Sequence, residues 1–141
     1  MSISLLPNEK RFRLRMGQSI VGYAREMGRT RYYSKDQFWW NGAMIQHNHV
    51  DECIGLKDLD NRPIFEFDIV EYALEGKRDR LGCILWSQKQ EVFIIKDLND
   101  SELNIPMSFD ELNLFAGNDL RFKAYLFAQP DLMRELGVRD N

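Results

Sequence analysis

The stretch from residue 64 to residue 96 constrains the fold most, because it holds three β-rich segments separated by short polar turns. The segments cover 64–72, 81–86 and 91–96, with a charged turn around Gly76 and a polar turn over 87–90. Strands joined by connections this short pair as antiparallel neighbours. The sequence therefore predicts an antiparallel meander at about 64–96, the usual core of a small barrel.

The first forty residues add further strands. Residues 10–16, "KRFRLRM", alternate charged and apolar side chains, with arginines at 11, 13 and 15, and this alternation predicts a half-buried strand. Residues 19–27 are ambiguous. Residues 28–42 predict a strand, a polar turn at 34–36, and an aromatic strand that ends at the hairpin dipeptide Asn41-Gly42.

The C-terminal part predicts small helical additions. Ser108 and Glu111 fit a capping box, so helical turns are expected at about 109–115. Residues 121–127 are typical of a last strand, and Pro130 begins a short helix at about 130–136 before Gly137. With no linker or repeat in the chain, we expect one domain over 1–141. Its predicted class is mainly β, a small SH3-like or partly open β-barrel.

The stretch from residue 54 to residue 72 is rich in acids, and the question is whether they are ligands. Asp58, Asp60 and Asn61 are turn formers, which predicts a hairpin turn between strands ending near Leu56 and starting at Ile64. A calcium loop needs oxygens at fixed offsets and a glycine at its sharp turn. Leu59 and Arg62-Pro63 break that pattern, so turn chemistry is favoured. A buried carboxylate needs a partner, so Asp68 either begins a new strand after a bend or accepts backbone N–H groups; the bend is favoured.

The same stretch resembles the signature of the YopX-like proteins, a family of small phage and prophage proteins. Residues matching that signature are Gly55, Leu56, Lys57, Asp58, Ile64, Phe65, Glu66, Asp68, Ile69 and Val70. Further similarity lies in "GCILWSQKQEVFII", with Gly82, Ile84 and Trp86, and more weakly in "YLFAQPDLM". The resemblance covers about 55–95 well, the C-terminus in part and the N-terminus only slightly.

Two positions depart from the family pattern. Asn61 replaces the turn glycine, and asparagine is the residue that best tolerates a positive φ there. Phe67 replaces the glycine before Asp68 and lacks its conformational freedom. The resemblance implies a β core at 54–96, a more divergent basic and aromatic part at 1–50, and phage or prophage origin. It implies no established biochemical activity and supplies no catalytic residues.

The net charge of −3 conceals an asymmetry along the chain. Residues 1–35 carry eight Lys or Arg and two acids, whereas the remainder carries eleven Lys or Arg and twenty acids. This basic third attracts a polyanion or faces the acidic body of the protein. If it binds nucleic acid, the candidate contacts interleave cations with aromatic rings. They are Arg25, Arg29, Arg31, Tyr32, Tyr33 and Lys35.

The N-terminal residues carry their charges in the wrong order for a signal peptide, and no apolar run is long enough to cross a bilayer. The expected location is the cytoplasm, without membrane association, where Cys53 and Cys83 would be reduced. His47, His49, Asp51 and Cys53 alternate and would share one face of a strand. These four residues could bind zinc, or they could form the exposed polar face of an edge strand or a loop. The exposed strand or loop is favoured over the zinc site.

No pattern of nucleophile, base and orienting group accompanies these residues. We therefore expect a non-enzymatic binding or regulatory protein, with no cofactor. Its partner would be an unknown protein or a second copy of the chain, and the alternative is a small barrel that binds nucleic acid through the basic third.

Overall fold

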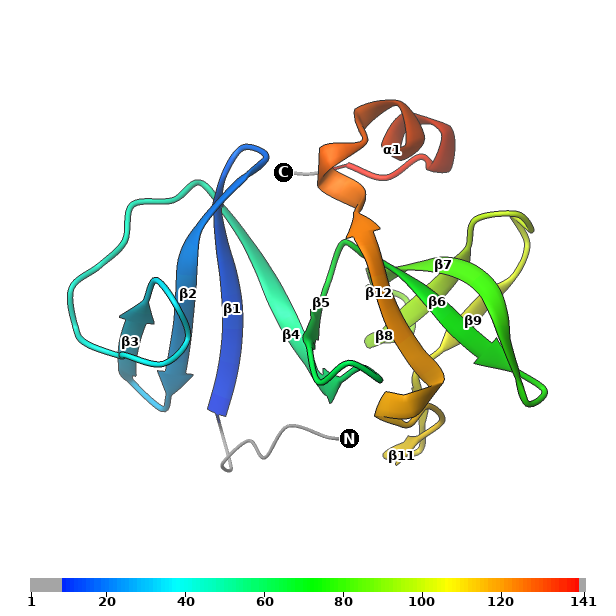
Figure 1. Cartoon of the computed structure of the whole chain (residues 1–141), viewed down its shortest axis with the longest axis horizontal. Coiled ribbons are helices and arrows are strands. Elements are labelled where there is room, and N and C mark those ends of the chain that lie inside the picture. The colour runs from blue at the N-terminus through cyan, green and yellow to red at the C-terminus, as the bar shows by residue number, and fades with distance from the viewer. Residues whose placement is uncertain (1–8, 140–141) are drawn as a thin grey trace.

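The computed structural model describes residues 9–139, which form two five-stranded antiparallel sheets (Figure 1). The first sheet has the order β3-β2-β1-β4-β5 and the second has the order β12-β6-β7-β8-β9. The mainly β class is confirmed, and the sheets do not close into a barrel, which agrees with a partly open arrangement. The first sheet comprises β1 (Glu9–Met16), β2 (Ser19–Met27), β3 (Thr30–Ser34), β4 (His49–Lys57) and β5 (Pro63–Phe65).

The predicted meander is confirmed as the core of the second sheet. β6 (Asp68–Leu74), β7 (Lys77–Ser87) and β8 (Val92–Asp97) pair in sequence order, with Ile84 opposite Ile95. β9 (Asn104–Pro106) extends β8, and β12 (Leu120–Tyr125) returns to pair with β6. Gly82 is required in β7, because an added Cβ would lie 2.5 Å from the Ile95 side chain.

The acidic turn after β4 is built by Asp58, as turn chemistry predicts. Its Oδ1 accepts the N–H groups of Asp60 and Arg62, and Asn61 has the expected positive φ of 65°. The other oxygen, Oδ2, accepts the N–H of Phe122 in β12 at 2.7 Å. This buried carboxylate therefore shapes the turn and also ties it to the second sheet.

The bend before Asp68 is also confirmed. β5 ends at Phe65, β6 begins at Asp68, and Phe67 between them has a φ of 71°. The N–H of Phe67 donates to Ile84 O and its carbonyl accepts the N–H of Leu126, each at 2.8 Å. Asp68 in addition accepts the N–H of Phe65, so both alternatives considered for it are present together.

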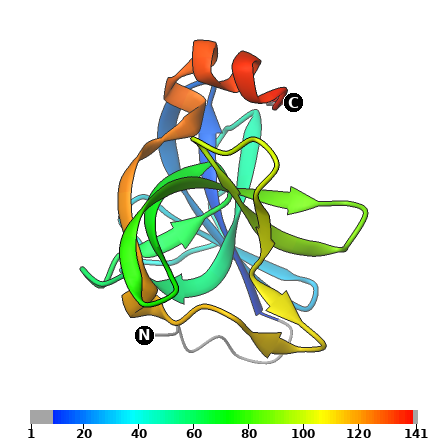
Figure 2. The same cartoon turned by 90° about the vertical axis from the view of Figure 1, so that its right-hand side faces the viewer.

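The C-terminal region confirms the helix α1 (Pro130–Leu136), which ends at Gly137 in the left-handed conformation. The helix expected at 109–115 is wrong. β10 (Ser108–Phe109) and β11 (Leu112–Asn113) form a hairpin there, because Asp110 and Glu111 both have positive φ. Figures 1 and 2 show that this hairpin and α1 lie at opposite ends of the second sheet. Short 3₁₀ turns, η1 (Gly117–Asp119) and η2 (Leu126–Ala128), flank β12.

Two expectations for the N-terminal part are also wrong. The predicted aromatic strand before Asn41-Gly42 is a loop, linked to β3 by a single bridge between Tyr33 and Asn41. In β1, the alternation indicated a buried apolar face and a charged solvent face, yet Arg13 and Arg15 are buried while Met16 is 42% exposed. Leu14 is buried as well, because β1 is central in its sheet and both of its faces are covered.

Residues 1–8, on which the expectation about a signal peptide rested, lie outside the described residues. Within residues 9–139, no helix has the length and apolar character that crossing a membrane requires.

Candidate functional site

A network of four buried charges lies between the two sheets. Arg13 and Arg15 on β1, Asp51 on β4 and Asp68 on β6 each have side chains at most 2% exposed. Arg15 binds both oxygens of Asp51 at 2.8 Å, while Arg13 bridges Asp51 at 2.8 Å and Asp68 at 2.6 Å. The network contains two cations and two anions, so its formal charges cancel. This pairing offsets the cost of removing the charges from water.

Aromatic rings cover the same guanidinium groups. Arg15 lies 4.0 Å from the ring centroid of Phe127, and Arg13 lies 5.0 Å from the rings of Phe65 and Phe127. Burial raises the pKa of Asp68 to about 6, although Arg13 and the Phe65 N–H oppose that change. The network thus joins the sheets, and its polar groups are engaged with one another.

The alternating residues weighed as zinc ligands do not converge. Asp51 is bound by the two arginines, His47 precedes β4 and contacts the Ile45 carbonyl, and Cys53 is buried. Among residues 9–139, no three His, Cys, Asp or Glu side chains are grouped as a metal site requires. Burial raises the pKa of the Cys53 and Cys83 thiols to about 11, so neither is an activated nucleophile.

The basic N-terminal third is largely neutralised within the fold. Six of its eight cations have an acidic partner, and these partners include Glu9, Glu26 and Glu52. Most of the sequence asymmetry is therefore internal pairing, which was one of the two alternatives for it.

The six candidate nucleic-acid contacts lie in β2, β3 and the adjacent turns, but they differ in exposure. Arg25 pairs with Glu9 at 2.9 Å, Arg31 pairs with Glu26 at 2.6 Å, and Tyr33 is buried. Arg29, Tyr32 and Lys35 are exposed. The structure thus leaves three of the six at the surface with their side chains accessible.

The most unusual exposed feature is the aromatic loop, residues 35–45, between β3 and β4. Phe38 is 85% exposed, Trp39 is 80% exposed and Met44 is 69% exposed. Sequence reasoning assigned these aromatics to a strand, where one face would have been buried. The signal that favours a loop is Ser34 with Asp36, because both side chains cap backbone N–H groups ahead of them.

The backbone of the aromatic loop is held in place despite its exposed side chains. Asp36 Oδ1 accepts the N–H groups of Phe38 and Trp39 at 2.8 and 3.0 Å, and these bonds lower the pKa of Asp36. Two backbone hydrogen bonds join Tyr33 to Asn41. The loop therefore presents its aromatic side chains from a preorganised backbone.

A hollow of about 310 Å³ lies beside the exposed aromatics. Tyr33, Trp39, Met44 and Ile45 give it an apolar lining, and Lys35 and Asp36 bring opposite charges to it. The aromatic loop thus combines protruding rings, an apolar recess and both signs of charge in one patch.

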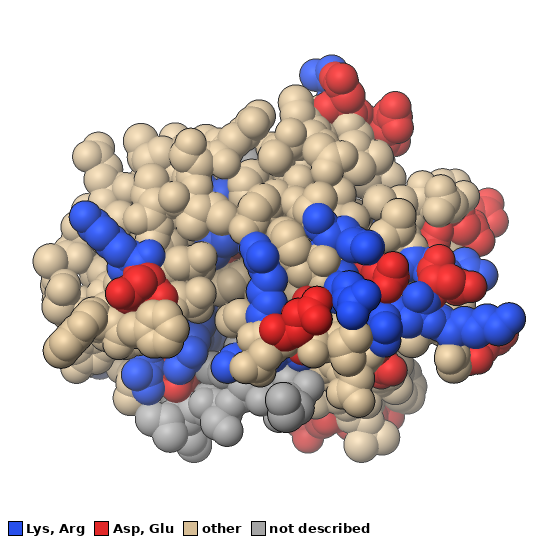
Figure 3. All heavy atoms as spheres, in the orientation of Figure 1, with Lys and Arg blue, Asp and Glu red and all other residues tan. Residues whose placement is uncertain are grey.

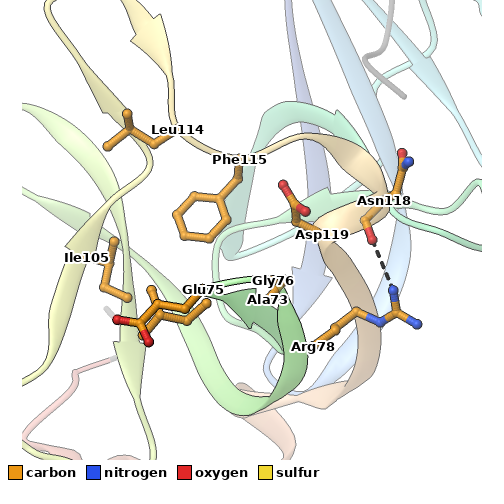
Figure 4. Close-up of a pocket in the computed structure, with 10 residues that line it drawn as sticks. Ala73, Glu75, Gly76, Arg78, Ile105, Leu114, Phe115, Asn118 and Asp119 are labelled. Carbon is orange, nitrogen blue, oxygen red and sulfur yellow. Dashed lines mark hydrogen bonds between the residues drawn. The ribbon is translucent and has the colours of Figure 1, made fainter.

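A second hollow, of about 650 Å³, lies between the β6–β7 turn and the segment 114–119 (Figure 4). It is an open recess whose lining includes Ile105, Phe115, Glu75 and Asp119. Arg78 donates to the Asn118 carbonyl at 3.1 Å at its edge.

Comparisons with protein-family models, with curated proteins and with solved structures find no match to this chain.

Proposed function

We propose that this protein is a non-enzymatic accessory protein of a phage or prophage that acts by binding a protein through the aromatic loop. The observation that carries the proposal is the exposure of Phe38 and Trp39 on a backbone fixed by Asp36. Exposed aromatic anchors on a rigid support are the residues that dominate binding energy at protein interfaces. Phage origin rests on the resemblance over 55–95.

The size of the apolar patch supports a binding role. Phe38, Trp39 and Met44 together expose on the order of 500 Å² of side-chain surface. A patch of that size equals the largest found on typical monomers, which is often functional. A symmetric contact that buries it on two copies would reach about 1,000 Å², the lower bound for a stable interface.

The first partner we expect is a second copy of the chain. Phe38 is 85% exposed and precedes Trp39, which lines the apolar hollow, and we propose a two-fold axis that places each Phe38 at the hollow of the other copy. The same axis would bring Lys35 of one copy toward Asp36 of the other. Knob, recess and opposite charges on one surface make it self-complementary.

Sedimentation velocity over a range of concentrations tests this proposal. The wild type should form dimers, and the double variant Phe38→Ser/Trp39→Ser should be monomeric with an unchanged melting temperature, because both side chains lie in solvent. The matched control is Phe109→Ser/Leu112→Ser in the β10–β11 hairpin, which removes two apolar side chains that are 65% and 68% exposed and should still dimerise.

A wild type that stays monomeric at high concentration contradicts self-association. A photo-crosslinking amino acid at position 38, compared with position 109, then tests binding to another protein inside the host cell. The absence of a specific adduct at position 38 would rule out protein binding through the aromatic loop.

The basic N-terminal third is the other candidate site, for nucleic acid. Its internal ion pairs remove most of the free charge that such binding needs, and no specific observation on those strands favours it.

A further inference from the structure

We infer that the surface over β12, β6 and β7, together with the hollow beside Tyr125, binds single-stranded nucleic acid. This surface, named here the β12 face, covers strands of the second sheet and reaches the seam with the first sheet at the hollow. The hollow is lined in part by Gln37 of the aromatic loop, but by none of the residues that carry the proposed function, Asp36, Phe38 and Trp39. The inference is therefore independent of the proposed function. It also places a polyanion site outside the N-terminal third, where the charge distribution along the sequence had indicated one.

The first support is local charge. The three strands carry five cations and two acids apart from the buried Asp68, although the whole chain has a net charge of −3. Figure 3 shows Lys and Arg side chains gathered over these strands, with some acids among them. The cations are Lys77, Arg78, Arg80, Arg121 and Lys123, and the acids are Glu71 and Asp79.

The second support is the way these cations are paired. Arg78 and Lys123 share one carboxylate, Glu71, at 3.4 and 3.7 Å. Arg80 approaches Asp97 at 3.6 Å, but Asp97 already accepts the Tyr72 hydroxyl at 2.6 Å. Arg121 has a partner of its own, Asp60 at 3.3 Å. The cations that share Glu71 keep a positive field that phosphates can neutralise.

The third support is a recess for a base next to the cations. A hollow of about 190 Å³ lies at the seam of the two sheets, lined by Tyr23, Phe65, Tyr125, Arg62 and Arg13 among others. β12 leads from Tyr125 at this hollow to the cations Lys123 and Arg121. Proteins that bind single-stranded nucleic acid without sequence preference use aromatic rings that stack on the bases and cations that contact the phosphates.

Arg62 is the residue that links the hollow to the cations. Its guanidinium lies 3.7 Å from the ring centroid of Phe122 and donates to the Tyr125 hydroxyl at 2.5 Å. The group is thereby held flat against β12 while the residue remains exposed. A flat guanidinium in this position offers a stacking surface to a base and a charge to its phosphate.

The recess distinguishes single strands from duplexes. A base can enter a hollow only when it is unstacked and unpaired, and the bases of a duplex are held inside the helix. The β12 face should therefore bind an unpaired strand more tightly than the same sequence as a duplex.

Fluorescence anisotropy with labelled oligothymidylate at low and moderate salt tests the inference. Arg121→Gln/Lys123→Gln should weaken binding about tenfold and reduce the salt slope by about 1.4, the value for two lost contacts to a single strand. The matched control Arg29→Gln/Lys35→Gln removes the same charge from exposed residues of the N-terminal third and should bind like the wild type. Far-UV circular dichroism checks that both variants are folded.

Two further arms test the recess and its chemistry. The wild type should prefer oligothymidylate over an abasic strand of equal length, and Arg62→Ala should remove that preference. Polyglutamate should not displace the oligonucleotide. The aromatic-loop variant Phe38→Ser/Trp39→Ser should bind it normally, so that failure of one proposal leaves the other to be judged separately.

Several results would overturn the inference. They are no binding at low salt, an equal or greater loss in the Arg29/Lys35 control, binding of duplex as tight as single strand, and equal affinity for the abasic strand. Displacement of the oligonucleotide by polyglutamate would instead indicate that the β12 face binds an acidic protein.

Discussion

Asp51 accepts hydrogen bonds from two buried arginines, and this single carboxylate anchors the charges at the seam of the sheets. Buried ions are tolerated only when they are paired, so each member of the network depends on the others. Removing one member leaves a buried charge without compensation, which costs more than the pair itself contributes. The network is therefore the place where single substitutions should have their largest effect on stability.

We expect Asp51→Ala to lower the free energy of unfolding by about 3–5 kcal/mol, because both guanidinium groups lose a buried partner. The control Arg134→Ala breaks a solvent-exposed ion pair with Asp131 and should cost less than about 1 kcal/mol. Urea unfolding of the two variants measures the difference. Equal losses would mean that the buried network contributes no more than a surface pair.

The raised pKa of Asp68 predicts a specific dependence of stability on pH. Its folded-state pKa, about 6, exceeds the ordinary 3.8, so the folded protein binds a proton more readily than the unfolded chain. The contribution of this group to stability therefore rises as pH falls from about 7 toward 4, by up to about 3 kcal/mol. Above about pH 7, the carboxylate is ionised, and the cost of burying its charge exceeds the stabilisation from its ion pair with Arg13.

Urea unfolding at several pH values checks this prediction by comparing the wild type with Asp68→Asn, which cannot titrate. The difference in stability between the two proteins should change across the window from about pH 7 to about pH 4. A constant difference would show that Asp68 titrates alike in the folded and unfolded protein.

At the scale of elements, the link between β5 and β6 is the feature on which both sheets depend. Phe67 adopts a positive φ that favours glycine, yet its side chain packs against the cluster of Ile69, Cys83, Leu126 and Met133. Phe67 thus combines a backbone conformation that favours glycine with a side chain that fills an apolar space. Strain in the backbone is offset by burial of the ring.

We expect Phe67→Ala to destabilise the protein more than Phe67→Gly does, by about 1 kcal/mol. Both variants lose the ring, but alanine keeps the cost of the left-handed conformation and glycine does not. Thermal unfolding of the pair measures the order. The opposite order would indicate that the bend relaxes out of the left-handed region when the ring is removed.

At the scale of the whole molecule, the two sheets are joined by several contacts besides the buried network. The Leu59 N–H donates to Leu120 O, Asp58 accepts the Phe122 N–H, and Arg62 donates to the Tyr125 hydroxyl. Together with the bond from Arg13 on β1 to Asp68 on β6, these contacts join the first sheet and the turn after β4 to the second sheet. The sheets should therefore unfold together.

Tryptophan fluorescence can follow each half separately. Trp39→Phe/Trp40→Phe leaves Trp86 as the reporter of the second sheet, and Trp86→Phe leaves the two reporters in the loop attached to the first sheet. For each variant, we expect the fluorescence midpoint to coincide with the midpoint from far-UV circular dichroism. Separate midpoints within one variant would mean that the sheets unfold independently.

The sequence by itself determined the local elements. The meander, the Asp58 turn, the bend at Asp68 and the helix at 130–136 all follow from residues close together in the chain, through turn chemistry, capping and strand alternation. The same local logic failed at 109–115, where two residues adopted positive φ, and at Phe38 and Trp39, where the caps by Ser34 and Asp36 prevailed over β propensity.

Only the tertiary structure decided which side chains are buried. Arg13 and Arg15 face the interior because their partners, Asp51 and Asp68, come from strands distant in sequence. Strand pairing likewise brings Arg25 on β2 to Glu9 on β1, whereas Arg78 on β7 and Lys123 on β12 share the carboxylate of Glu71. A strand pattern specifies alternation between two faces, but which face is covered depends on the other strands that pack against it.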